Sequence, residues 1–197
     1  MRAYKFLMDN YKAMYGDFQY EIGETYIHNG YIELCKAGFH ASGEIKDAIR
    51  YCSGSHLVEV ELGGKIIEGL DKVVASEITI LKELDLVKEL ETLASDEYWG
   101  VRCAVAYNPN TPVEILETLA GDRLWDVRRA VASNPNTSTK ILETLAGDEN
   151  SDVRRGVAYN LNTSVEILKT LAGDKNCWVR NAVAENLNRK KEDDSEN

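Results

Sequence analysis

Apolar residues return every 26 residues through the second half of the chain, as from Leu90 to Leu116. Three such columns run through four successive units. They consist of Leu90, Leu116, Leu142 and Leu168; of Leu93, Leu119, Leu145 and Leu171; and of Val101, Val127, Val153 and Val179. A fixed period of this length is typical of repeat proteins, in which each unit is one small piece of supersecondary structure.

Each unit has the pattern of two short helices. Thr111 suits the N-cap of the first helix, Pro112 its first helical position and Glu114 a capping box. Gly121 follows at the point where a left-handed C-terminal residue is expected. The second helix has an apolar stripe, formed in one unit by Val127, Ala130 and Val131. Helices this short are unstable alone, so the units are expected to stack and share one core.

Charged and amide columns keep the same period. An arginine follows each column valine, at Arg102, Arg128, Arg154 and Arg180, and an aspartate recurs at Asp96, Asp122, Asp148 and Asp174. The arginines either pair with these aspartates in an internal ladder or form a row that binds anions. The arginines and aspartates occur in equal numbers and at the same period, which favours the ladder. The asparagines at 108, 134, 160 and 186 are expected to be structural, because asparagine readily caps turns and helix ends.

Units such as "DVRRAVASNPNT", from Asp126 to Thr137, resemble the leucine-rich repeat variant, a relative of HEAT-like helical repeats. The resemblance covers about residues 86–188. It implies a right-handed α-helical solenoid of four two-helix repeats that acts as an interaction scaffold. One branch of that family carries an iron–sulfur cluster on a separate cysteine-rich segment. Because this chain has no four clustered cysteines, that cofactor does not carry over, and no cofactor is expected.

The first 84 residues lack this period and alternate in the manner of strands. The stretches "AYKFL", "YIELC", "LVEVEL" and "EITIL" are rich in β-branched and aromatic residues, and "LGGKIIEG" looks like a turn into a further strand. One helix is expected over 42–52, with Ser42 as its N-cap. The fold class is therefore α+β: a small N-terminal α+β domain over 1–84, then the solenoid over 85–188.

The N-terminal half also resembles a known domain. Its segments "CKAGFHAS" and "DKVVASEITI" look like parts of a domain of uncharacterised function that recurs in phage and prophage-like proteins. That resemblance implies a mobile-element origin and a capping or docking role, and it implies no reaction. The tail over 189–197, "RKKEDDSEN", is charged and without apolar residues, so it is expected to be disordered.

Composition narrows the classes of partner. The net charge is −10 and the pI about 4.9. From Glu83 onward the chain has 14 Lys and Arg against 21 Asp and Glu, a net charge of −7, which argues against direct nucleic-acid binding. The start "MRAYKFLMDNYK" has no signal-peptide core, and no apolar run is long enough to span a membrane. The expected location is the cytosol, with the four cysteines reduced.

Columns that vary inside the constant frame indicate where a partner binds. The position opening the second helix is Trp99, Trp125, Ser151 and Cys177; the next is Gly100, Asp126, Asp152 and Trp178; another is Tyr107, Ser133, Tyr159 and Glu185. A core position would keep one residue type, and exposed Trp and Tyr are typical interface anchors. The predicted partner-binding residues are Trp99, Trp125, Trp178, Tyr107, Tyr159, Asp126 and Asp152. Alternatively, Trp99 and Trp125 cover the seams between units.

Two chemical alternatives lie in the N-terminal half. Cys35, His40, Cys52 and His56 follow a zinc-like order, but both cysteines fall on apolar positions, so no metal is expected. An enzyme with its active site around His40 is the alternative function, with the solenoid as its substrate-recognition scaffold. No motif of known mechanism surrounds His40. The sequence therefore favours a non-catalytic protein binder. Its hypothesised partner is a nucleic-acid-binding host protein that it inhibits or redirects, such as a defence nuclease of the CRISPR effector type.

Overall fold

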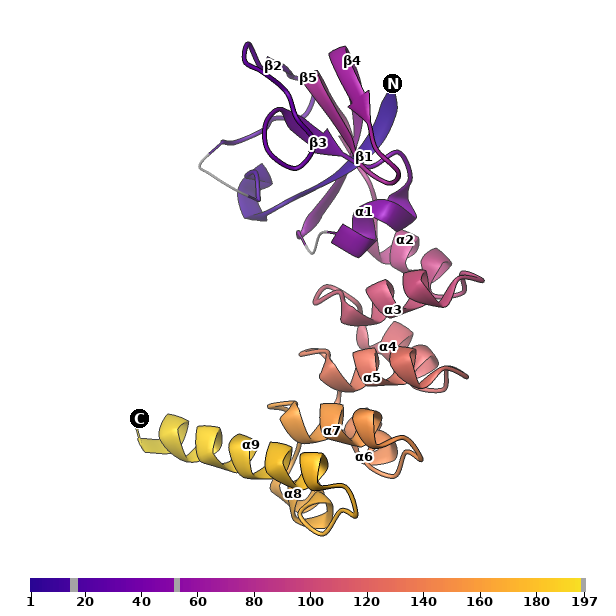
Figure 1. Cartoon of the computed structure of the whole chain (residues 1–197), viewed down its shortest axis with the longest axis vertical. Helices are drawn as coiled ribbons and strands as arrows, with labels where there is room; N and C mark the ends of the chain where they lie inside the picture. The colour runs from indigo at the N-terminus through magenta and orange to yellow at the C-terminus, as the bar shows by residue number, and fades with distance from the viewer. Residues whose placement is uncertain (15–17, 52–53, 196–197) are drawn as a thin grey trace. The chain divides into compact units, whose positions relative to one another are not determined.

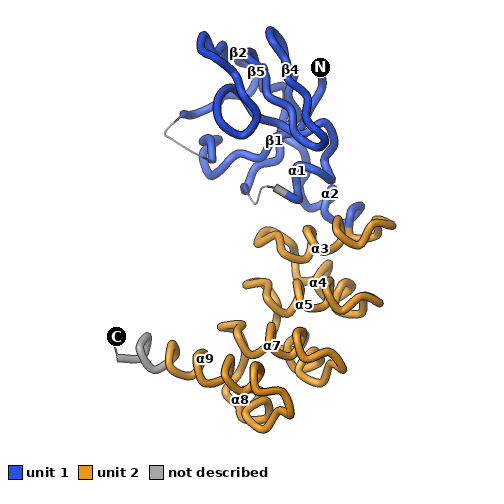
Figure 2. Tube along the Cα trace, in the orientation of Figure 1, with its two compact units in different colours: residues 1–93 blue, residues 94–197 orange. Residues whose placement is uncertain are grey.

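The computed structural model describes residues 1–14, 18–51 and 54–195 (Figure 1). The chain divides into two compact units, residues 1–93 and 94–197 (Figure 2). The sequence pattern places the boundary after residue 84. The difference arises from α2 (Leu86–Leu93), which groups with the first unit although its leucines belong to the repeat columns.

An antiparallel sheet forms the frame of the first unit. Its strands run in the order β1 (Arg2–Leu7), β4 (His56–Glu68), β5 (Val73–Glu83) and β2 (Thr25–Ile27), and β3 (Phe39–Ala41) also pairs with β5. The long strands β4 and β5 form a hairpin. Short η1 (Asp9–Tyr11) follows β1, and α1 (Ile45–Tyr51) packs against β1. The predicted α+β head, one helix on an antiparallel sheet, is confirmed.

Alternation along the strands builds the core of this unit. Val58, Val60 and Leu62 of β4 are buried, while Glu59 and Glu61 between them point away from the core. Ile78 and Ile80 of β5 are fully buried beside them. Since successive side chains of a strand point to opposite faces, this pattern fixes which face of the sheet is covered.

Three local predictions for this half are wrong. Residues 31–35 form no strand: residues 34–36 are a turn closed by an isolated bridge between Glu33 and Ala37, and Cys35 in it has a positive φ of 63°. Gly63 lies within β4 at a register irregularity, so "LGGKIIEG" continues one strand instead of starting another. Ser42 exchanges two backbone hydrogen bonds with Tyr4 and so extends the pairing next to β3, which leaves the helix to begin at Ile45.

The second unit is a run of short helices that alternate between two sets. The set formed by the second helix of each repeat packs side by side, and the first helices lie against it (Figure 1). The second helices are α3 (Trp99–Tyr107), α5 (Trp125–Ser133), α7 (Ser151–Tyr159) and α9 (Cys177–Ser195). The first helices are α4 (Val113–Leu119), α6 (Thr139–Leu145) and α8 (Val165–Leu171). This arrangement confirms the helical repeat solenoid.

The apolar columns form the core of the second unit. Leu142 of α6 and Val127 and Val131 of α5 have no exposed surface, and the equivalent residues of the neighbouring repeats are buried likewise. One repeat thus supplies only a few core residues. Stacking makes those residues continuous from unit to unit, which explains why the pattern is repeated.

The arginine column forms the internal ladder. Arg102, Arg128 and Arg154 each donate from Nε and Nη2 to the aspartate of the following repeat, at 2.6–3.1 Å. The third guanidinium nitrogen, Nη1, donates to a backbone carbonyl of the arginine's own unit, as in Arg128 to Asp122 at 2.9 Å. The bidentate pairing therefore links neighbouring repeats and uses these guanidinium groups, so they do not form an anion-binding row.

Amide side chains form a second ladder. Asn134 Nδ2 donates to the carbonyls of Ala106 and Asn108, one repeat earlier, at 2.7 and 2.8 Å. Asn160 and Asn186 repeat these bonds in the following units. The expectation that the asparagines are structural is confirmed.

The predicted helix ends need correction. Thr111 is fully buried, and its hydroxyl donates to the Val105 carbonyl instead of capping α4. Where a side chain does cap a first helix, it is the next residue, as when Ser138 accepts from Ile141. Gly121 does not have a positive φ, and the residue before it, Ala120, is still helical. At the other end of the unit, α9 continues through Ser195 into the segment for which disorder is expected; that segment is rich in Lys and Glu, which favour helix.

Candidate interaction surface

The aromatic residues of the variable columns lie on the second helices and are exposed. Relative exposure is 42% for Trp99 and 43% for Tyr107 of α3, 37% for Trp125 of α5, 39% for Tyr159 of α7 and 63% for Trp178 of α9. Side chains this open are not core residues. The second-helix set therefore presents a row of large aromatic groups to solvent.

Helix geometry explains this exposure. In α5, Val127 and Val131 face the core, and Trp125 and Arg129, four residues apart, share a neighbouring face. The Arg129 guanidinium lies 5.9 Å from the centre of the Trp125 ring, within the range of a cation–π contact. The aromatic face is thus set by the same register that builds the core.

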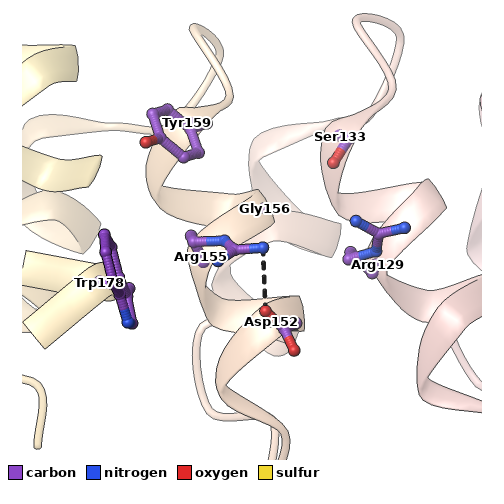
Figure 3. A pocket seen from close by; sticks show the side chains of 7 residues that line it. All are labelled: Arg129, Ser133, Asp152, Arg155, Gly156, Tyr159 and Trp178. Carbon is purple, nitrogen blue, oxygen red and sulfur yellow. Dashed lines mark ion pairs between the residues drawn. The ribbon is translucent and has the colours of Figure 1, made fainter. Parts of the chain in front are cut away.

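A groove of about 360 Å³ opens among α5, α7 and α9 (Figure 3). Arg129 and Ser133 of α5 line it on one side, Trp178 of α9 on the other, and α7 lies between them. The residues contributed by α7 are Asp152, Arg155, Gly156 and Tyr159. The groove thus joins charged, polar and aromatic groups from three successive repeats.

The charged residues of the groove differ in their pairing. Arg155 Nη2 pairs with Asp152 Oδ1 of the same helix at 3.0 Å. Arg129 forms no hydrogen bond or ion pair within the described ranges, and its Nε is a buried donor without a partner. Next to the groove, the Arg189 guanidinium lies 5.8 Å from the Tyr159 ring centre. Among the described residues, the Arg129 guanidinium therefore has its cation–π contact with Trp125 but no hydrogen-bond or ion-pair partner.

Two known protein families match parts of this chain. A family model described as the leucine rich repeat variant matches residues 99–124 and 125–150. Residues 99–150 of the second unit are leucine-rich repeat variant repeats. A second model, a domain of unknown function (DUF7666), matches residues 1–92. The resemblance to the leucine-rich repeat variant is therefore confirmed, as is the expectation that the N-terminal half is a domain of uncharacterised function. The leucine-rich repeat variant fold indicates a scaffold for protein interaction.

A structure search also finds a leucine-rich repeat variant. The solved structure, described as a leucine-rich repeat variant with a novel repetitive protein structural motif, is 31% identical to this chain, with a TM-score of 0.42. The match covers 49% of this chain and 39% of that chain. No curated protein matches the sequence. No helix in the described ranges is long and apolar enough to cross a membrane.

The groove joins only some of the predicted partner-binding residues. Asp152, Tyr159 and Trp178 line it, whereas Trp99 and Tyr107 lie on α3, outside it. Asp126 lies in the first turn of α5, and its backbone carbonyl accepts a bond from the Cys103 thiol at 3.7 Å. These residues all belong to the second-helix set, and their role in binding stays a prediction.

Sequence reasoning missed Arg129, Arg155, Ser133 and Gly156 as members of one site. A signal was present in the leucine-rich repeat variant frame, because the column after the ladder arginine varies. It contains Cys103, Arg129, Arg155 and Asn181. The variation in this column was easy to overlook because the constant column of ladder arginines precedes it directly. In the sequence "VRR", a ladder arginine and a surface arginine are adjacent.

The residues considered for a metal site or an active site in the N-terminal unit have different environments. His40 is in β3, and its Nε2 is buried without a hydrogen-bond partner in the described chain. Burial, foremost, lowers the pKa of His40. Cys35 is exposed on its turn, and Cys52 lies outside the described residues. Across the described residues, no group of three or more His, Cys, Asp or Glu is placed to hold a metal ion.

One polar cluster of this unit was not foreseen. Glu83 accepts a hydrogen bond from the Tyr11 hydroxyl at 2.6 Å, and its other oxygen lies 2.7 Å from His56 Nδ1. The Tyr11 and His56 rings stack at 4.4 Å. The bond from Tyr11, with that from His56, lowers the pKa of Glu83 despite partial burial. The cluster joins the start of β4 to the end of β5, so His56 has a structural partner.

Proposed function

We propose that this protein is a non-catalytic interaction module that holds a partner protein against the second-helix face of its repeats. The supporting observation is the row of exposed aromatics, of which Trp178 is 63% exposed. Large aromatic side chains supply most of the binding energy in many interfaces because they bury much area with few rotatable bonds. A face of this kind is costly to leave in water unless a partner covers it.

The partner we propose is a nucleic-acid-binding host protein, such as a defence nuclease of the CRISPR effector type, which the module inhibits or redirects. The net charge of −10 supports this choice, because an acidic surface attracts basic proteins and repels nucleic acid. The mobile-element origin that the sequence resemblance of residues 1–84 implies is our reason for choosing a host protein as the target. Trp99, Trp125, Trp178, Tyr107 and Tyr159 are proposed as aromatic anchors, with Asp126 and Asp152 as charged contacts.

A paired substitution tests the face. We expect Trp99→Ala with Trp125→Ala to weaken binding of the purified partner by about tenfold or more, since truncating an interface anchor commonly costs over 1 kcal/mol. The partner is first captured from a host lysate with the parent protein and identified. The control is Leu161→Ala with Val165→Ala, which removes two apolar side chains that are 54% and 43% exposed outside the second-helix set.

Calorimetry of each variant against the purified partner provides the measurement, and thermal unfolding checks that the variants are folded. Equal affinities of the tryptophan pair and the parent protein would refute the proposed face. A loss in the control pair as large as that in the tryptophan pair would place the binding surface elsewhere. Unfolding of the tryptophan pair alone would show that these residues support the fold, contrary to their exposure.

A further inference from the structure

The repeat changes to small residues at two points that line the groove among α5, α7 and α9. Ser133 occupies the column in which the neighbouring repeats have Tyr107 and Tyr159. Gly156 occupies a column in which the other three repeats have alanine. A Cβ at Gly156 would lie 3.2 Å from Ser133 Oγ, so the two positions adjoin. Ser133 thus leaves room for a side chain of a partner, whereas Gly156 allows α7 to pack closely on α5, since a Cβ there would lie 3.0 Å from Ala132 Cβ.

Arg129 is the group in this groove that is prepared for a ligand. Its neighbour Arg128 donates to Asp148 and to a backbone carbonyl, and Arg155, one repeat later, pairs with Asp152. Arg129 has neither kind of partner among the described residues, although its Nε is buried. Because a hydrogen bond between a guanidinium and a carboxylate is charge-assisted and strong, a ligand carboxylate is an acceptor that suits Arg129.

The surroundings select a single carboxylate over a polyanion. Asp152 lines the groove, Asp126 lies in the first turn of the helix that carries Arg129, and the chain from Glu83 onward has a net charge of −7. A nucleic-acid backbone would bring several phosphates toward these carboxylates. One acidic side chain in the groove can pair with the Arg129 guanidinium, and the Trp178 and Tyr159 rings are available to a neighbouring apolar group.

We propose that this groove takes an extended segment of a partner protein in which an acidic residue adjoins an aromatic one. The Arg129 guanidinium binds the carboxylate, and the aromatic side chain packs against Trp178 and Tyr159. This inference rests on the proposed function and names the local chemistry that it uses. A partner that is basic overall and displays one such acidic–aromatic segment satisfies both the general attraction and the local pairing.

Peptide binding tests the proposal directly on the full chain. The probes are fluorescein-labelled peptides that alternate Asp with Phe, or Asn with Phe, and a labelled thymidine oligonucleotide, each measured by anisotropy. We expect the Asp peptide to bind about tenfold or more tightly than the Asn peptide, because a hydrogen bond to a charged group is worth about that factor. The oligonucleotide is expected not to bind.

Two variants locate the binding. Ser133→Tyr fills the groove with the residue that the adjacent repeats have in the same column, and Arg129→Gln removes the guanidinium; each is expected to abolish the preference for the Asp peptide. Arg123→Ala is the matched control, since it removes one exposed positive charge outside the groove and is expected to change nothing. If Ser133→Tyr does not fold, Arg129→Gln alone decides.

Several results would overturn the proposal. They are no binding of the Asp peptide at about 1 mM, equal binding of the Asp and Asn peptides, an unchanged preference in Arg129→Gln, or oligonucleotide binding lost in the same variant. Failure here is separable from failure of the proposed function. If the purified partner still binds Ser133→Tyr and Arg129→Gln but not the tryptophan pair, the aromatic face holds the partner and the groove does not.

Discussion

Removal of one ladder arginine tests whether the charged columns stabilise the repeats. Arg128 and Asp148 are 13% and 7% exposed, and their two hydrogen bonds measure 2.7 and 3.0 Å. Arg128→Ala would leave the Asp148 carboxylate buried next to a void. Breaking a buried pair by removing one partner costs about 3–5 kcal/mol, most of it from the charge left behind.

The chain contains its own control at the same column. Arg180 is exposed and donates only to the backbone carbonyls of Asp174 and Lys175, at 2.7 and 3.2 Å. Arg180→Ala therefore strands no buried carboxylate, and we expect it to cost about 1 kcal/mol or less. Both substitutions delete the same side chain from the same position of a repeat. The difference between their losses of unfolding free energy therefore measures the contribution of the arginine–aspartate ladder.

Urea unfolding followed by tryptophan fluorescence provides the assay. All three tryptophans, Trp99, Trp125 and Trp178, lie in the second unit, so the signal reports the repeats alone. Since a loss of this size approaches the total stability of a small domain, Arg128→Lys serves as a milder variant that keeps the charge and loses the planar fork. Equal midpoints for Arg128→Ala and Arg180→Ala would refute the view that the ladder carries stability.

Three further predictions concern the same unit. Asn134→Ala should cost about 2–3 kcal/mol in urea unfolding, because two backbone carbonyls of the preceding repeat lose their buried donor; a change under 0.5 kcal/mol would contradict the amide ladder. Gly147→Ala should stabilise by about 0.4–1 kcal/mol, since its φ is not positive and an added Cβ meets only a backbone oxygen at 3.7 Å; a lower melting temperature would show a missed constraint. The hydrogen bonds from Arg154, foremost, hold the pKa of Asp174 below its usual range, so the pair stabilises the fold above about pH 4, and this contribution disappears as the pH falls through the folded pKa. The urea midpoint should therefore drop below pH 4 less steeply in Asp174→Asn than in the parent protein.

The repeat half was predictable because one constraint acts at every unit. Val127 is buried for the same reason as its equivalents in the other three repeats, so the period alone identifies the core. The Arg128–Asp148 pairing followed from equal numbers of opposite charges at equal spacing. The sequence did not show which aspartate each arginine pairs with. Each arginine pairs with the aspartate of the next repeat because of how far one unit is displaced from its neighbour, and only the packed structure determines that displacement.

The N-terminal half was less predictable because its contacts are not repeated. The segment around Cys35 has the composition of a strand, but it folds as a turn in which Ile32 is buried. Strand composition measures only how well side chains fit a half-buried surface, and a turn that buries an isoleucine satisfies the same preference. The Tyr11–Glu83 hydrogen bond joins residues far apart in sequence, and the sequence around neither residue predicts it.

The candidate site lies between these two cases. The frame of the repeats makes departures visible, so Trp178 and Tyr159 could be singled out as surface residues before their exposure was known. The groove lacks the tyrosine ring that neighbouring repeats have at the Ser133 column, and Gly156 lets α7 pack closely on α5, since a Cβ there would lie 3.0 Å from Ala132 Cβ. A column comparison shows that these residues are smaller than their equivalents, but only the packing of α5 against α7 shows that the two losses adjoin. Ser133 and Gly156 adjoin beside Arg129, which has no hydrogen-bond or ion-pair partner among the described residues. The departures from the repeat therefore meet at one place, where a carboxylate can be bound.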